Sequence, residues 1–274
     1  MKVLERVTIA LFVLALVVYI GSTLYYDNMV DRTPPVLSCD NTPLEVSVRD
    51  PESALLVGVT ATDDRDGDLT DRIQIRGISQ LLTADTAKVS YIVFDSSDNM
   101  ATCTRYIRYT DYEKPRFSLT QPLVFAVGEL VDTKVILDRV RVNCTLDGDI
   151  SDQVQIAVQN IEGAKEGTYN ITFQVINSMG DTRVLKTRVV VDNAGAKLPL
   201  VQLNRYCAYV STGSSFDPAS YISQVTAPDG SVVPANAVTI DSNVDTAVPG
   251  NYIVAYTYET PERSYTAYLA VIVE

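Results

Sequence analysis

The chain has 274 residues, and its 22 Lys and Arg against 34 Asp and Glu give a net charge of −12. This charge repels phosphate backbones, so we expect no nucleic-acid partner. The sequence has no histidine, which excludes Ser-His-Asp and Cys-His catalytic sites and histidine-bound zinc. A hydrophobic content of 46% suits folded domains, and the many Val, Ile, Thr and Tyr residues favour strands over helices.

The first predicted element is an apolar segment at residues 7–26, which carries no charge and is long enough to cross a bilayer as a helix. Lys2 and Arg6 precede it and acidic residues follow it. The positive-inside rule therefore predicts a single-pass signal anchor in the cell membrane, with residues 1–6 in the cytoplasm and the remainder extracellular. A cleaved signal peptide shares these features, but the segment lacks a good Ala-x-Ala cleavage site.

Residues 27–33 are predicted to form a short polar stalk, which ends at a Pro-Pro pair that cannot continue a helix. Pro115 and Pro199 stand at matching places further along, with spacings of 80 and 84 residues, and each is followed by a short apolar strand. Spacings of this length indicate repeated modules rather than solenoid turns. We predict three similar domains, at residues 34–110, 111–192 and 193–274.

Each domain contains one long run in which apolar side chains fall on every second residue, the pattern of a half-buried strand. These runs lie at residues 88–93, 167–175 and 250–258, and the last two begin with Gly-x-Tyr. Turn signals such as Asp-Gly recur about every 8 to 12 residues, which is typical of a β-sandwich. The fold class is thus all-β, with three tandem sandwiches after one transmembrane helix. Short linkers without a Gly/Ser tether predict that the domains stand end to end.

Several recurring phrases resemble bacterial surface immunoglobulin-like domains. They are residues 61–73 with Asp66-Gly67-Asp68, Asp95 to Asn99, Asp147-Gly148-Asp149, Gly167 to Tyr169, residues 213–218 and residues 244–252. The resemblance covers residues 34–274 and implies tandem immunoglobulin-like sandwiches that serve outside the cell as stalks or adhesive modules. It implies no catalytic activity and no fixed ligand. The third domain lacks the Asp-Gly-Asp phrase, which weakens any site built on these loops.

An acidic loop in the first domain is the sharpest local feature of the sequence. Closely spaced carboxylates are what a hard cation needs, and they make a candidate calcium site of Asp63, Asp64, Asp66 and Asp68. Leu69 stands where an EF-hand loop requires glycine, so that template does not apply. The alternative is a solvated hairpin in which Asp-Gly supplies the turn and the charges protect strand edges. We expect no other cofactor.

The four cysteines lie outside the predicted membrane segment, where a disulfide persists. Cys39 and Cys103 belong to the first and last strands of one domain, and these strands are neighbours in many immunoglobulin-like sandwiches. The resemblance therefore implies a disulfide between them. Cys144 and Cys207 belong to different domains; we expect two buried thiols, and the alternative is an interdomain or intermolecular bridge.

Tyrosines on the last domain suggest a binding surface, because tyrosine is favoured at interfaces. Tyr265 and Tyr268 cannot both face inward on a regular strand, so the exposed one is our candidate contact residue. We predict a non-catalytic, membrane-anchored bacterial surface protein that acts as a stalk or as a module for a protein or glycan ligand. The alternatives are a calcium-rigidified cadherin-like rod and an accessory subunit of a larger cell-envelope complex.

Overall fold

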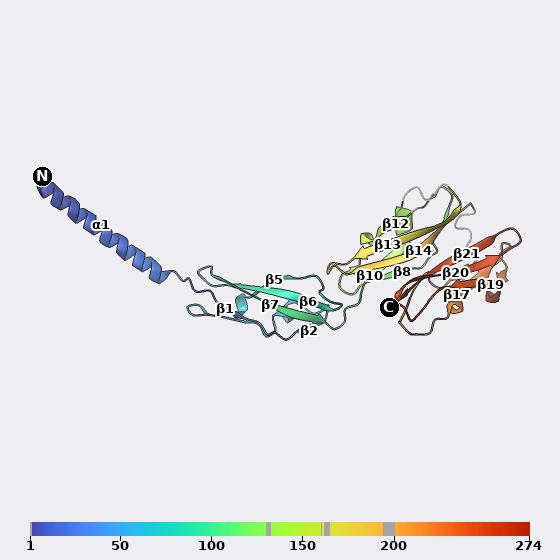
Figure 1. Cartoon of the computed structure of the whole chain (residues 1–274), viewed down its shortest axis with the longest axis horizontal. Helices are drawn as coiled ribbons and strands as arrows, with labels where there is room; N and C mark the ends of the chain where they lie inside the picture. Colours follow the sequence, from blue (N-terminus) through green and yellow to red (C-terminus); the bar gives the residue numbers. More distant parts are fainter. Residues whose placement is uncertain (1, 130–132, 160, 162–164, 194–200) are drawn as a thin grey trace. The chain divides into compact units, whose positions relative to one another are not determined.

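The computed structural model describes residues 2–129, 133–159, 161, 165–193 and 201–274. It is mostly β-structure with one N-terminal apolar helix, which confirms the predicted fold class (Figure 1). The chain divides into two compact units, Met1–Thr110 and Asp111–Glu274. The division falls at the predicted end of the first domain, and the second unit contains two sandwiches.

Helix α1 (Lys2–Met29) is the N-terminal element. Within it, Val3–Tyr25 is long and apolar enough to cross a membrane, with a mean hydropathy of 2.4, and its most apolar stretch is not buried against the chain. The helix reaches Met29, and Asp31 just beyond it is buried in the first sandwich. Within the predicted stalk at residues 27–33, the first residues thus continue the helix and Asp31 is bound to the folded domain.

The first sandwich has a three-stranded sheet in the order β1-β3-β4 and a four-stranded sheet in the order β2-β7-β6-β5. Strand β2 pairs with β7 in parallel, while the other pairs are antiparallel. The strands are β1 (Val36–Ser38), β2 (Leu44–Val46), β3 (Thr60–Asp63), β4 (Gly67–Asp68), β5 (Gln74–Ile78), β6 (Thr86–Phe94) and β7 (Met100–Tyr109).

The second sandwich repeats this topology, with sheets β11-β10-β8 and β12-β13-β14-β9 and a parallel pair between β14 and β9. One short helix, α2 (Lys134–Leu137), lies between β9 and β10. The strands are β8 (Arg116–Leu119), β9 (Val124–Ala126), β10 (Val140–Cys144), β11 (Gly148–Asp149), β12 (Gln155–Gln159), β13 (Gly167–Ile176) and β14 (Thr182–Asp192).

The third sandwich has the same order again, with sheets β15-β17-β18 and β16-β21-β20-β19. Strand β16 runs parallel to β21, as β2 does to β7. The strands are β15 (Val201–Leu203), β16 (Cys207–Val210), β17 (Ile222–Thr226), β18 (Val232–Val233), β19 (Val238–Ser242), β20 (Gly250–Glu259) and β21 (Ser264–Val273). Three copies of one strand order show that the sequence repeat is a structural repeat.

The long alternating strand of each domain supplies the centre of its core. On β6, Val89, Tyr91 and Val93 are fully buried, and Phe173 and Tyr256 occupy the place of Tyr91 on β13 and β20. The Tyr91 hydroxyl donates to the Leu55 carbonyl oxygen at 2.6 Å. A buried hydroxyl needs such a partner, because leaving it without one costs about 1–3 kcal/mol.

The Gly-x-Tyr phrase has a packing reason. On β13 the Tyr169 ring lies over Gly167, and a Cβ at that glycine would meet the tyrosine hydroxyl at 3.1 Å. The same hydroxyl donates to the Lys165 carbonyl oxygen at 2.9 Å. Glycine therefore opens the strand because the tyrosine side chain needs the space above its backbone.

The second and third sandwiches pack against each other and share one hydrophobic cluster. The Tyr206 amide donates to the Leu119 carbonyl oxygen at 2.8 Å, and the Tyr209 hydroxyl accepts from the Phe117 amide at 2.7 Å. The Arg183 guanidinium also pairs with the Glu274 carboxylate. The end-to-end arrangement expected from the linker is therefore wrong for this pair, because linker length does not reveal that the two surfaces are complementary.

Candidate metal centre

Asp63 closes strand β3 of the first sandwich, and its carboxylate sits at the turn into β4. Its Oδ1 accepts hydrogen bonds from the amides of Arg65 and Asp66, at 2.9 and 2.8 Å. These bonds form the usual Asx turn. The other oxygen, Oδ2, is buried and has no hydrogen-bond partner among the described residues. A buried oxygen without a partner is unusual in a folded protein.

Asp95 follows strand β6 and occupies the turn into β7. Its Oδ1 accepts from the amides of Ser97 and Asn99, both at 2.8 Å, and its Oδ2 accepts from the Asn99 side-chain amide at 2.7 Å. Asp98 in this turn has a φ of 64°, in the left-handed region. Burial raises the pKa of the Asp95 carboxyl, but the hydrogen bonds outweigh this effect and hold the pKa below its usual value. Asp95 is therefore a fixed carboxylate.

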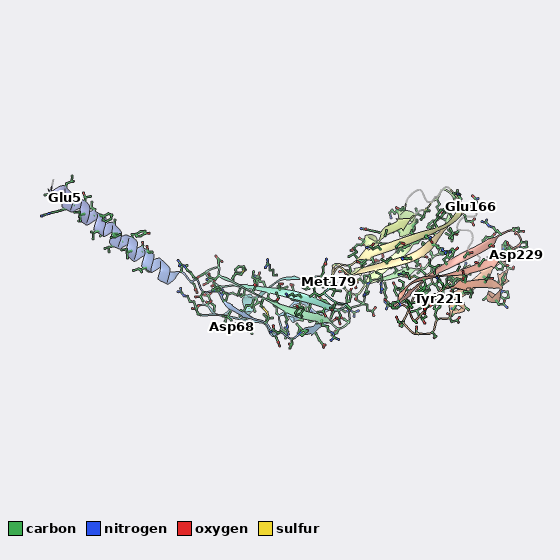
Figure 2. The ribbon with its side chains drawn as sticks, in the orientation of Figure 1. Glu5, Asp68, Glu166, Met179, Tyr221 and Asp229 are labelled. Carbon is green, nitrogen blue, oxygen red and sulfur yellow. A yellow bond between two sulfur atoms is a disulfide. The ribbon has the colours of Figure 1, made fainter. Side chains whose placement is uncertain are left out.

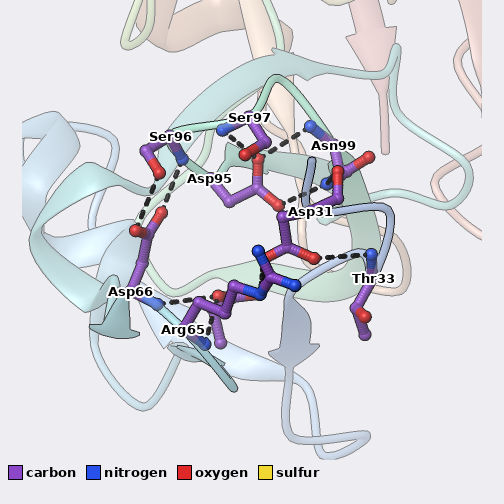
Figure 3. A network of polar contacts seen from close by, with 9 residues as sticks. Asp31, Thr33, Arg65, Asp66, Asp95, Ser96, Ser97 and Asn99 are labelled. Carbon is purple, nitrogen blue, oxygen red and sulfur yellow. Dashed lines mark hydrogen bonds and ion pairs between the residues drawn. The ribbon is translucent and has the colours of Figure 1, made fainter. Parts of the chain in front are cut away.

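Asp31 comes from the segment between α1 and β1 and is 6% exposed. Its Oδ1 accepts from the Thr33 amide at 2.9 Å, and its carbonyl oxygen accepts from the Asn99 side chain at 3.1 Å. The Arg65 Nε atom lies 3.6 Å from the Asp31 Oδ2, and the arginine side chain is about half exposed. Figure 3 shows Asp31 beside Asp95 with the Arg65 side chain across it.

Asp31, Asp63 and Asp95 thus converge from three separate parts of the first unit. Each offers a buried carboxylate oxygen, and these oxygens lie within 4.8 Å of one another. At an effective dielectric constant of about 20, two such charges repel by roughly 3 kcal/mol. Three carboxylates against one guanidinium leave an excess of two negative charges in this cluster. We refer to these three residues as the Asp31 cluster.

Only one of the four predicted calcium residues belongs to the Asp31 cluster. Asp63 does; Asp64 is exposed. The Asp66 carboxylate accepts from the Ser96 hydroxyl at 2.8 Å and so ties the β3–β4 turn to the turn that carries Asp95. Asp68 (Figure 2) accepts from the Thr70 amide at 2.9 Å, and hydrogen bonds from the Thr70 side chain and amide lower its carboxyl pKa. These residues shape the loop.

Sequence reasoning missed Asp31 and Asp95 as members of a site. Asp95 stood within a phrase that the resemblance identified, so its recurrence was a usable signal. Asp31 gave none, because it lies 32 residues from Asp63 and only the fold brings the two together. The density of acidic residues along one loop was therefore a poor guide to which of them converge.

The second sandwich has neutral residues at the positions that correspond to Asp63 and Asp95. Cys144 and Asn177 occupy the positions of Asp63 and Asp95, because Ser178 binds Asp147 as Ser96 binds Asp66. The Asn177 amide donates to the Tyr112 hydroxyl at 2.8 Å and contacts the Cys144 sulfur at 3.7 Å. Burial, reinforced by Asp181, raises the pKa of Tyr112. The Tyr112 hydroxyl also donates to the Asp181 carboxylate at 2.8 Å, so one carboxylate with its own donor stands here in place of three that converge.

The third sandwich places Thr260 at the corresponding turn. Its hydroxyl donates to the Arg263 carbonyl oxygen at 2.9 Å and accepts from the Arg263 amide at 3.2 Å. A single residue therefore closes this turn locally. Among the described residues, the convergence of three carboxylates is particular to the first sandwich.

Cys39 and Cys103 are joined by a disulfide, with Cα atoms 6.4 Å apart. Cys144 and Cys207 are both free and buried, as expected. Burial raises the pKa of the Cys207 thiol to about 12, partly offset by Arg183. A thiol with so high a pKa is unreactive at neutral pH.

Tyr265 and Tyr268 are both half-buried on opposite faces of β21. Tyr268 lies under the Arg188 guanidinium of the second sandwich, 4.9 Å from its ring centre, so it takes part in packing within the unit. Tyr265 stacks with Arg263 at 5.3 Å and lines a cavity of about 290 Å³ between the two sandwiches. Tyr265 thus lines this cavity, while the Tyr268 ring is covered by Arg188.

Together these features describe a chain of three β-sandwiches behind an apolar helix, with a buried acidic cluster on the first sandwich. No family model matches the chain. It is similar to the pesticidal crystal protein Cry22Aa of Bacillus thuringiensis, at 25% identity over 236 residues, which is 82% of this chain. The chain spans 31% of the length of that relative.

Among solved structures, the chain is similar to CBM51-2, in complex with GlcNAc, and INT domains of Clostridium perfringens ZmpB. The identity is 17%, the match covers 55% of this chain and 26% of that one, and the TM-score is 0.24. It is also similar to a lipoprotein of Bacteroides thetaiotaomicron, at 11% identity over 86% of this chain and 98% of the other, with a TM-score of 0.21.

Proposed function

We propose that the protein is anchored in the cell membrane by α1 and carries its sandwiches outside the cell, as a stalk or as a binding module for a protein or glycan. The observation that supports this most is the combination of an unburied apolar helix with a disulfide in the sandwich that follows it. Disulfides persist in oxidising compartments. Lys2 and Arg6, at the N-terminal end of α1, favour a cytoplasmic N-terminus under the positive-inside rule, and that sandwich would then lie on the oxidising side.

The anchor is tested with the full chain expressed in bacterial cells. We expect the protein to stay in the membrane fraction after a carbonate wash, and protease added to intact cells to digest the sandwiches. The Cys39–Cys103 disulfide should form in the same cells. A soluble product whose N-terminus lies near Leu24 would instead identify α1 as a cleaved signal peptide. Sandwiches that stay protected in intact cells but are digested after lysis would reverse the proposed orientation.

A binding role is supported by Tyr265, which lines the cavity between the second and third sandwiches beside Arg263. Aromatic and arginine side chains are enriched at recognition surfaces. A glycan and cell-wall screen of the full chain in detergent should give signals that Tyr265→Ala removes. Tyr106→Ala is the matched control, because Tyr106 is an exposed tyrosine of the first sandwich. Silence across the screen would favour a spacer.

We also propose that the protein is non-catalytic. The first sandwich's loop carboxylates Asp66 and Asp68 are bound to nearby backbone and hydroxyl groups, where they shape turns rather than line a cleft. The alternative of a rod rigidified by calcium at each junction is less favoured, because the second and third sandwiches meet through protein side chains. A cation in the first sandwich is a separate question.

A further inference from the structure

We propose that Asp31, Asp63 and Asp95 form a binding site for one hard divalent cation, for which calcium is the best fit. The cation would fasten the segment that follows α1 to the first sandwich. The metal site rests on the cluster alone, whereas its role beside the membrane rests on the proposed function.

The unpartnered Oδ2 of Asp63 is the observation that carries the proposal. It is buried and faces the oxygens of two other buried carboxylates. Folded proteins satisfy buried polar atoms, and a carboxylate that faces like charges is the costliest kind to leave without a partner. A cation among the three oxygens supplies the missing partner.

The excess charge of the cluster also fits one divalent ion. Three carboxylates and the Arg65 guanidinium leave two negative charges, which one divalent cation neutralises. Oxygens that lie within 4.8 Å of one another fit one calcium sphere, in which opposite ligands are up to about 5 Å apart. Bidentate carboxylates and water would complete the six to eight oxygens that calcium takes.

The ligand loops are already held in place without the ion. Asp63 and Asp95 are fixed by amides of their own turns, and Asp66 joins those turns through Ser96. Asp31 comes from the segment before the first strand of the sandwich, and it is held by the Thr33 amide and Asn99. The ion would therefore bind two fixed ligands and draw in a third.

The second sandwich makes the corresponding contact with neutral residues at the three equivalent positions, and its Tyr112 hydroxyl donates to the Asp181 carboxylate at 2.8 Å. The Tyr112 hydroxyl, near the start of the second unit, accepts a hydrogen bond of 2.8 Å from the Asn177 side chain, and Asn177 contacts Cys144. Each of these atoms has a partner, so this place needs no ion. The first sandwich has carboxylates at all three of these positions, and a cation would join their oxygens directly.

The test uses the full chain in detergent micelles, stripped of calcium with EGTA and then given CaCl2 or MgCl2. Calorimetry follows thermal unfolding, and a reducing agent identifies the transition of the first sandwich, which holds the disulfide. We expect 10 mM CaCl2 to raise this transition by about 5–10 °C. Equilibrium dialysis with radioactive calcium should find one ion per chain.

Two matched variants separate the site from general charge effects. Asp63→Asn should abolish the calcium shift, and Asp64→Asn, which removes the same charge from an exposed neighbour, should retain it. Without calcium, Asp63→Asn should melt no lower than the wild type, because its Oδ1 keeps its hydrogen bonds and an amide donor replaces the unpartnered oxygen. Asp31→Asn, which changes the ligand that precedes the first strand, should also abolish the calcium shift.

Hydrogen exchange tests whether the cation attaches the segment that follows α1 to the first sandwich. Calcium should slow amide hydrogen exchange at residues 30–33 by about tenfold in the wild type and leave it unchanged in Asp63→Asn. The proposal is overturned if 10 mM calcium shifts nothing and dialysis finds no ion, or if Asp64→Asn loses the response as Asp63→Asn does. Neither result would alter the membrane-fraction assay, so the anchor and the cation site fail independently.

Discussion

Tyr209 is the residue whose replacement tests most directly whether the second and third sandwiches form one unit. Its hydroxyl accepts from the Phe117 amide at 2.7 Å. Its ring lies under two guanidinium groups, those of Arg116 at 4.9 Å and Arg183 at 5.5 Å. Burial raises the pKa of Tyr209, so the hydroxyl stays protonated at neutral pH.

Each of these contacts contributes a separate amount to the stability of unit 2. Tyr209→Phe leaves the Phe117 amide without its acceptor, which should cost about 1 kcal/mol. Tyr209→Ala also removes two cation–π contacts, worth about 1 kcal/mol together, and a half-buried ring, worth about 1 kcal/mol more. We therefore expect a loss of about 3 kcal/mol for the alanine variant, a large share of a domain's usual 5–15 kcal/mol.

The assay is urea unfolding of the full chain in detergent, followed by near-ultraviolet circular dichroism. The wild-type second unit should unfold in one transition, and the midpoint of that transition should fall in the order wild type, Tyr209→Phe, Tyr209→Ala. Tyr106→Ala, in the first unit, should leave this transition unchanged. The reasoning is refuted if Tyr209→Ala unfolds within about 0.5 kcal/mol of the wild type, or if the two sandwiches unfold independently before any substitution.

Three further predictions follow from the covalent and titrating groups. Replacing Cys39 and Cys103 together by serine should destabilise the first sandwich by about 4 kcal/mol, because the bond closes a loop with a sequence separation of 64; reductant should then have no effect on its melting. The depressed pKa of Asp95 contributes stability above the usual value of 3.8, so melting of the first sandwich should fall as pH drops below about 4, and Asp95→Asn should flatten this dependence. Cys207 should resist iodoacetamide at pH 8 until urea unfolds the chain, since its pKa is about 12; rapid labelling of the folded protein would contradict its burial.

Much of the fold could be predicted because the pattern of core residues recurs in each of the three domains. The alternation around Tyr91, Phe173 and Tyr256 predicts a central strand in each domain, and each of these residues is fully buried there. The alternation of side chains is a property of a single strand, so it can be recognised in the sequence regardless of how the domains pack against each other. The contact between the second and third sandwiches depends instead on residues far apart, such as Phe117 and Tyr209, and no local pattern reports it.

The Asp31 cluster was only partly predictable for the same reason. Asp63 was predicted as a metal ligand because it lies in an acidic loop. Its neighbour Asp64 is exposed, because successive side chains at a strand end point in different directions. Aligning the repeats gives a better signal. Cys144 stands three residues before Asp147 as Asp63 stands before Asp66, so the substitution of an acid for a buried neutral residue is visible in the sequence itself.

The most direct test of the cation site is a crystal structure of the full chain grown in about 10 mM CaCl2. We predict a single calcium ion with oxygens of Asp31, Asp63 and Asp95 at roughly 2.3–2.6 Å. An ordered cluster with no ion, or calcium bound by Asp64 and Asp68 instead, would contradict it.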